Sequence, residues 1–159
     1  MITSYLVYAS PLGDLMLVAN ETALTGMHIV HGKHVPAVQP GWVNARNHPL
    51  LNQTQRELDA YFHGQRRTFA VPLAPQGTVF QKKAWTALLA IPFGETRTYG
   101  QQALAIGRPS AARAVGAANG KNPIGIIIPC HRVIGASGAM TGYAGGLDAK
   151  RFLLNLENG

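Results

Sequence analysis

The sequence contains a single cysteine, Cys130, among its 159 residues. One cysteine cannot form an internal disulfide, so the chain is not a disulfide-stabilised secreted domain. Its apolar runs are too short to cross a bilayer. Met1 to Leu6 lack the basic region and the long apolar core of a signal peptide. These absences lead us to expect a cytoplasmic, reduced protein with no membrane partner.

Acidic residues are also scarce, and their scarcity is uneven along the chain. The sequence has 14 Lys and Arg against 7 Asp and Glu, a net charge of +7. Residues 1–76 carry five basic and four acidic residues, whereas residues 77–159 carry nine and three. A basic excess confined to one half indicates a polyanionic partner such as nucleic acid. A solvated basic surface without a partner is the alternative.

The residue pattern predicts an α+β fold in two parts. Short alternating or apolar runs separated by turn residues are typical of strands. The expected strands are residues 5–10, 15–19, 24–30 and 68–73, with the first two joined as a hairpin. Residues 31–48, rich in Gly, Pro and His, are expected to form a loop, and 50–62 a helix. Residues 1–76 are therefore interpreted as a small α/β structural domain with an antiparallel sheet.

The remaining residues, 77–159, are predicted to form a mostly helical domain. Two segments have the Thr-x-x-Gln pattern of a capping box, in which each side chain satisfies a backbone N–H at the start of a helix. They begin at Thr78 and Thr98. The apolar face predicted for the first of these helices consists of Phe80, Ala84, Trp85, Leu88 and Leu89. A further helix is expected over 147–158.

Two short helices joined by a tight turn predict a helix-turn-helix. They cover residues 99–106 and 111–118, and Ser110 is expected to cap the second. Helices that read the major groove need long polar side chains, but this second helix has tiny ones and a single arginine. These residues are Ala112, Arg113, Ala114 and Gly116. Such a face allows close approach to the minor groove, with the arginine inserted into the duplex; helix-on-helix packing is the alternative.

Cys130 is placed in a segment that is unusual for a buried cysteine. An apolar run, Ile126 to Ile128, precedes it, and His131 and Arg132 follow. The run is expected to be a buried strand that delivers the thiol into a pocket. An unperturbed thiol is only a few per cent ionised at neutral pH, and a neighbouring base or positive charge changes that balance. The alternative is a small buried side chain without chemistry.

Several segments of the second half carry a family resemblance. They are residues 80–101, 108–116, 119–123, 128–133 (Ile-Pro-Cys-His-Arg-Val) and 142–147, with Lys150, Leu153, Leu154 and Glu157. Together these segments resemble the O6-alkylguanine-DNA alkyltransferases, single-turnover repair proteins also called methylated-DNA–protein-cysteine methyltransferases. The first half of the chain is similar to that family only in outline.

The resemblance implies a reaction and the residues that carry it. An alkyl group, methyl above all, would move irreversibly from O6 of guanine in double-stranded DNA, and also from O4 of thymine, to Cys130. His131 would act as base through a water, and Glu157 would orient and stabilise that histidine. Asn122 would belong to the network that organises the site. Tyr99 would donate a hydrogen bond to the departing guanine.

The resemblance also implies how the lesion reaches the thiol. Tyr99 would crowd the phosphate and help rotate the base out of the stack, and Arg113 would take its place in the duplex. The pocket would be formed by the carbonyls of Cys130 and Val133, the N–H of Ala144 and the ring of Tyr143. A monomer is expected, with cooperative assembly on DNA left open.

Neither a cofactor nor a metal is expected. The sequence has no phosphate-cradling loop that would bind a cofactor. Transfer of the alkyl group to sulfur leaves a stable thioether, so the reaction requires no cofactor. Some members of the family hold zinc with cysteines of the N-terminal domain, which this chain lacks. His28, His31 and His34 are evenly spaced, but on a predicted strand and loop their rings need not converge.

Two readings from other classes stay open. The chain could be a non-enzymatic protein that binds alkylated DNA as a sensor, although the presence of Cys130, His131 and Glu157 argues against it. It could also be an unrelated cysteine hydrolase. That activity would need an oxyanion hole beside the thiol and repeated turnover, and it leaves the alanine-rich helix unexplained.

Overall fold

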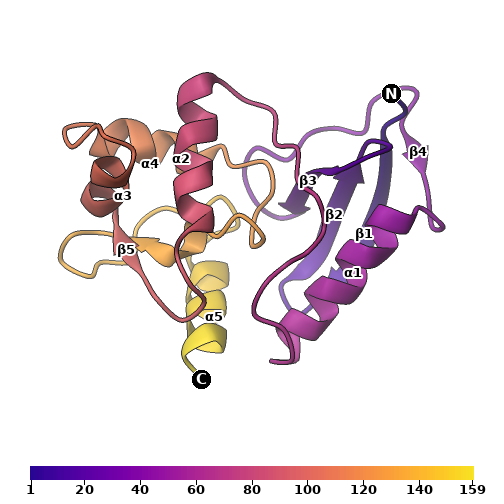
Figure 1. Ribbon diagram of the computed structural model, residues 1–159. Helices are drawn as coiled ribbons and strands as arrows, with labels where there is room; N and C mark the ends of the chain where they lie inside the picture. The colour runs from indigo at the N-terminus through magenta and orange to yellow at the C-terminus, as the bar shows by residue number, and fades with distance from the viewer.

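A hairpin at the start of the chain forms the middle of a four-stranded sheet (Figure 1). The computed structural model describes residues 1–159. The strands are β1 (Ser4–Ser10), β2 (Gly13–Ala19), β3 (Leu24–Ile29) and β4 (Val43–Asn44). Their order is β3-β2-β1-β4, with antiparallel pairing throughout except that the short β4 runs parallel to β1. The predicted hairpin and third strand are confirmed, and the expected loop 31–48 contains β4.

Helix α1 (Pro49–Phe62) packs against this sheet (Figure 1). His48 caps it by accepting a hydrogen bond from the N–H of Leu50, and proline at the first helical position removes an N–H that would have no partner there. The buried side of the helix consists of Leu51, Thr54, Glu57, Leu58 and Tyr61. The packing of α1 therefore places one aromatic hydroxyl, that of Tyr61, in the interior of the molecule.

The strand expected at residues 68–73 is not present. Only a single bridge joins Leu73 to Leu24, beside a hydrogen bond of 2.8 Å from the N–H of Leu24 to the carbonyl of Pro72. Proline has no N–H to continue a ladder, so the extended segment passes the start of β3 without becoming a strand.

About half of the chain after residue 77 is helical, and the predicted α+β class is confirmed. The helices are α2 (Val79–Leu89), α3 (Tyr99–Ala105), α4 (Ala112–Gly120) and α5 (Leu147–Asn158). Both predicted capping boxes, at Thr78 and Thr98, are complete. Leu89, expected on the buried face of α2, is half exposed. None of the helices has the length and apolar character that crossing a membrane requires.

Helices α3 and α4 form the predicted helix-turn-helix, but Ser110 does not cap the second helix. The N-cap is Ala111, which makes no side-chain cap bond. The N–H of Ala111 bonds the carbonyl of Arg108 at 2.9 Å, which closes the turn with Ser110 inside it. The two helices are held together by a buried amide pair, in which Gln102 and Asn119 exchange hydrogen bonds of 2.8 and 2.9 Å.

The segment that leads to the cysteine is attached to the edge of the sheet. Met27 of β3 donates a hydrogen bond of 2.9 Å to the carbonyl of Pro123 and accepts one of 3.1 Å from the N–H of Gly125. Figure 1 shows β3 as the strand that faces the helical part. Backbone hydrogen bonds therefore position the cysteine segment relative to the first half of the chain.

Candidate active site

Cys130 begins a short 3-10 helix, η1 (Cys130–Arg132), rather than ending a strand as expected. The preceding run is turned instead of extended because Ile126 has a φ of 66°, in the left-handed region. That conformation is strained for a β-branched residue. The run continues with tight turns, including a hydrogen bond of 2.8 Å from the N–H of Cys130 to the carbonyl of Ile128. After η1, β6 (Val133–Ile134) pairs in parallel with β5 (Arg97–Thr98).

The Cys130 thiol is buried and has one side-chain hydrogen-bond donor. Nδ2 of Asn122 lies 3.4 Å from Sγ and 2.8 Å from the carbonyl of Ile128. Oδ1 of the same amide accepts the N–H of Ile124 at 3.0 Å, which fixes its orientation. Burial raises the pKa of Cys130, and the Asn122 hydrogen bond and the charge of Lys150 lower it only in part. The thiol therefore needs a base before it can act as a nucleophile.

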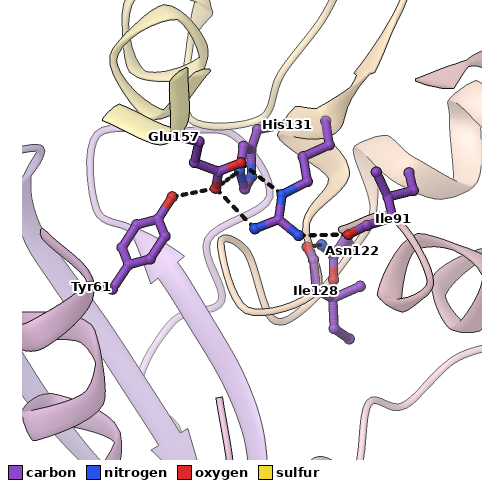
Figure 2. Close-up of polar contacts among 7 residues, drawn as sticks. Tyr61, Ile91, Asn122, Ile128, His131 and Glu157 are labelled. Carbon is purple, nitrogen blue, oxygen red and sulfur yellow. Dashed lines mark hydrogen bonds and ion pairs between the residues drawn. The ribbon is translucent and has the colours of Figure 1, made fainter. Parts of the chain in front are cut away.

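His131 is fully buried and is paired with a carboxylate. Its Nε2 lies 2.7 Å from Oε2 of Glu157 (Figure 2). Burial lowers the pKa of His131, although Glu157 opposes the shift. Because Nε2 faces a carboxylate, we assign the ring proton to that nitrogen, which leaves Nδ1 as an acceptor. Nδ1 is buried and has no hydrogen-bond partner, so it is free to accept a proton.

Glu157 at the end of α5 collects hydrogen bonds from three side chains (Figure 2). Arg132 donates to both oxygens, at 2.7 Å from Nε and 3.0 Å from Nη2. The hydroxyl of Tyr61 donates at 2.6 Å. Burial would raise the pKa of Glu157, but the hydrogen bonds from His131 and Arg132 lower it to about 2. The carboxylate is therefore a permanent negative charge beside the imidazole.

Two members of this cluster are not among the site residues that the sequence predicts. Arg132 was considered only as a nearby positive charge, whereas its guanidinium also donates to the carbonyl of Ile91 at 2.7 Å. A signal was available, because an arginine in a run predicted to be buried requires an acidic partner. Tyr61 carried no signal, since it lies 96 residues from Glu157 and in the other half of the chain.

The thiol opens onto a cavity of about 230 Å³ between α3, α4 and the loop before α5. Tyr99, Gly116, Cys130, Tyr143 and Ala144 are among its lining residues. The N–H of Ala144 has no acceptor within the protein. The ring of Tyr143 stands edge-on to His131, with centroids 6.5 Å apart. Three of the predicted pocket or base-rotating residues, Tyr99, Tyr143 and Ala144, therefore surround one space together with the thiol.

Val133, also predicted for the pocket, does not line this cavity. Its carbonyl accepts a hydrogen bond of 2.6 Å from Nζ of the buried Lys150. The same ammonium donates to the carbonyl of Thr141 at 2.6 Å. Burial lowers the pKa of Lys150. Lys150 thereby links the loop before α5, which lines the cavity and is called the cavity loop below, to β6.

One side of α4 is buried against the rest of the protein, and the other side is accessible to solvent. Val115, Ala118 and Asn119 are buried, whereas Arg113 and Ala114 are exposed and Ala112 and Gly116 are intermediate. Gly116 faces the cavity, where an added Cβ would lie 3.6 Å from the ring of Tyr99. The hydroxyl of Tyr99 accepts a hydrogen bond of 3.1 Å from Thr141. Arg113 is exposed on α4, one turn before Gly116, and takes no part in the buried cluster.

The three evenly spaced histidines do not converge. The structure has no group of three or more His, Cys, Asp or Glu that could hold a metal ion. His28 lies on β3, where burial lowers its pKa to about 4. His31 and His34 are exposed on the loop that follows.

Two protein-family models match this chain, one over each half. Residues 3–75 match the ribonuclease-like domain of 6-O-methylguanine DNA methyltransferase, and residues 79–159 match the DNA-binding domain of the same family. A methylated-DNA–protein-cysteine methyltransferase of Methanosarcina acetivorans is 52% identical over 153 residues, covering 96% of this chain and 97% of the relative. The chain belongs to the methylated-DNA–protein-cysteine methyltransferase family. The predicted family and enzyme class are thereby confirmed.

Other members of the methyltransferase family agree in sequence and in fold. The relative from Mycobacterium leprae is 49% identical over 148 residues, which are 93% of this chain and 88% of the relative. A crystal structure of Mycobacterium tuberculosis OGT in complex with DNA superposes with a TM-score of 0.91 at 46% identity. It covers 98% of this chain and 92% of that one.

Proposed function

We propose that this methyltransferase repairs double-stranded DNA by moving an alkyl group from O6 of guanine to Sγ of Cys130, once per molecule. The observation that carries the proposal is the buried, unpartnered Nδ1 of His131, the residue that follows the only cysteine, with Glu157 bound to the opposite nitrogen. A pair of this kind can take the thiol proton while the carboxylate stabilises the imidazolium.

The chemical step balances without a further reactant. His131 takes the thiol proton, directly or through one water. The thiolate then forms an S–C bond to the alkyl carbon as the C–O6 bond breaks. The electron pair of that bond stays on the guanine, which regains a proton from its surroundings, with the hydroxyl of Tyr99 as a nearby donor. The product is a neutral thioether at Cys130, which water does not readily cleave. O4-alkylthymine presents the same O–alkyl bond and is included as a second substrate.

A base must leave the stack to reach this thiol, because Cys130 is buried at the inner wall of the cavity. Extrusion costs a few kcal/mol and less for a base that already pairs badly. The exposed small-residue face of α4 allows close approach to the minor groove, with Arg113 entering the vacated position. Tyr99 lies at the boundary between that face and the cavity.

The two parts of the chain then have different roles. We assign residues 77–159 to DNA binding and alkyl acceptance, and residues 1–76 to structural support. Support for that division comes from the edge bonds of Met27 and from the hydroxyl of Tyr61, which hold the cysteine segment and Glu157 from the first half. The protein is proposed to act as a monomer in the cytoplasm, where its single thiol stays reduced.

One observation favours a sensor that binds alkylated DNA without repairing it. Burial raises the pKa of Cys130, which disfavours the thiolate that alkyl transfer requires. Mass spectrometry after incubation with duplex DNA containing O6-methylguanine separates the two functions. We expect one methyl group on the Cys130 peptide, in a stoichiometric amount, and a Cys130→Ser variant that binds the lesion without accepting it. Lesion binding by an unmodified parent protein would establish the sensor, and repeated turnover would indicate a hydrolase.

The role of Arg113 is tested by comparing duplex and free-base substrates. We expect Arg113→Ala to slow repair of the duplex lesion far more than transfer from free O6-benzylguanine, because the free base needs no extrusion. Arg151→Ala is the control, since Arg151 is exposed on α5 and pairs only with Asp148. Equal losses of Arg113→Ala on both substrates would exclude insertion into the duplex.

A further inference from the structure

Two residues of the loop after β3 line the cavity that holds the thiol. Lys33 and His34 lie in the first half of the chain, but both line the cavity of about 230 Å³ together with Tyr99 and Gly116. They also line a larger neighbouring cleft of about 550 Å³, which shares Cys130. The wall of the candidate site is therefore completed by the domain to which only structural support has been assigned.

The position of this loop is fixed by backbone contacts with the cavity loop. The N–H of Lys33 donates a hydrogen bond of 2.7 Å to the carbonyl of Ala144. The two backbone segments approach so closely that a Cβ on Gly32 would lie 2.5 Å from the same oxygen. His34 adopts a φ of 60°, a left-handed conformation that histidine tolerates better than most side chains. Lys33 is thus held at the cavity by its own backbone and by the residues on either side of it.

The charge of Lys33 has no partner within the protein. Its side chain is exposed and takes part in none of the ion pairs of the structure. An extruded base would fill the inner part of the cavity beside Cys130, which leaves its sugar and phosphates at the mouth. An ammonium group at the mouth of a cavity that receives a nucleotide is suited to a phosphate oxygen.

We infer that Lys33 binds a phosphate next to the extruded nucleotide, so that the N-terminal domain holds the flipped state directly. This inference rests on the proposed function, because it requires an extruded nucleotide. It assigns to the loop 31–34 a part in substrate binding that is separate from the contacts of α4 with the duplex.

The test compares Lys33→Ala with Lys83→Ala, which removes the same charge from an exposed position on α2 outside both cavities. We expect Lys33→Ala to weaken binding of a duplex containing O6-methylguanine about threefold to tenfold and to reduce the salt slope by about 1. Transfer from free O6-benzylguanine, which has no phosphate, should keep its rate. Lys33→Arg, which retains the charge, should restore duplex binding.

Three results would overturn the inference. Equal effects of Lys33→Ala and Lys83→Ala would reduce Lys33 to general surface charge. Equal losses on duplex and free base would mean that Lys33 walls the base pocket. Faster duplex repair in Lys33→Ala would show that the loop obstructs the mouth. Methylation of Cys130 in the parent protein is measured in parallel, so failure of the proposed function is recognised separately.

Discussion

The hydroxyl of Tyr61 donates a hydrogen bond of 2.6 Å to Oε2 of Glu157, the oxygen that also faces His131. This bond joins α1 to α5 across the two parts of the chain. The Tyr61 ring is held among aromatic neighbours, with centroids 5.5 Å from Phe69 and 6.2 Å from Phe93. The first half of the molecule therefore supplies a rigid donor to the carboxylate that orients the proposed base.

Removing that hydroxyl tests whether Tyr61 positions Glu157. Tyr61→Phe keeps the ring contacts, and we expect the free energy of unfolding to fall by about 1–3 kcal/mol because a bond to a charged group is lost. Methyl transfer should slow. Without this donor, the Glu157 carboxylate stabilises a protonated His131 more strongly, and the pKa of His131 rises. Because the proposed base must be neutral to act, the acid limb of the rate profile should move to higher pH. Single-turnover kinetics across pH measures both effects.

Tyr8→Phe is the matched control for this prediction. Like that of Tyr61, the hydroxyl of Tyr8 donates a hydrogen bond to a carboxylate, in this case that of Asp59 at 3.2 Å. Asp59 lies on α1 and outside the thiol cluster. Its removal should leave the transfer rate and its pH profile unchanged. An unchanged profile in Tyr61→Phe, or an equal change in both variants, would refute a positioning role for Tyr61.

Arg132 is predicted to be the main stabilising partner of the buried carboxylate. Arg132→Met keeps much of the side-chain volume but leaves Glu157 without its cation, and breaking a buried pair costs about 3–5 kcal/mol. Arg132→Lys should recover only part of the loss, since an ammonium cannot reproduce the two-pronged contact. Urea denaturation measures both variants. Arg67→Met, which removes an arginine stacked on the ring of Phe93, should cost far less. Full stability of Arg132→Lys would show that only charge matters.

Asn122 is predicted to tune the acidity of the thiol. Its hydrogen bond to Sγ lowers the pKa of Cys130, so Asn122→Ala should raise that pKa. Asn122→Asp keeps the acceptor for Ile124 but adds a negative charge, and should raise the pKa further. The pH dependence of alkylation by iodoacetamide reports the order. If wild-type protein and both variants react with the same pH dependence, the amide does not act on the thiol.

His28 is predicted to make the fold sensitive to mild acid. Burial lowers its pKa from 6.5 to about 4. Below pH 6.5 the unfolded chain takes up a proton on this histidine before the folded protein does. The free energy of unfolding is therefore highest above pH 6.5 and decreases as the pH falls toward 4. Thermal denaturation should therefore show a decline over this range that is shallower in His28→Gln. His63→Gln, at an exposed position, is the control, and parallel curves for His28→Gln and the parent would contradict the prediction.

Local structure was predicted well wherever neighbouring residues decide it. The capping boxes at Thr78 and Thr98 and the helix 147–158 depend on side chains three or four positions apart, and the structure contains all of them. The segment before Cys130 was predicted wrongly, because its apolar composition is equally compatible with a strand or with buried turns. The left-handed conformation of Ile126 is imposed by its surroundings and has no signal in the sequence.

The sequence by itself determined which reactive groups the protein carries: one thiol followed by a histidine, a basic second half, and segments that resemble a repair family. Tertiary structure decided how that chemistry is arranged. It brought Tyr61 to Glu157 across 96 residues, gave Arg132 a structural partner and placed Lys33 on the wall of the cavity. The reason is physical, since covalent neighbours and local hydrogen bonds can be read along the chain, whereas a buried charge selects its partners only after the two halves have packed together.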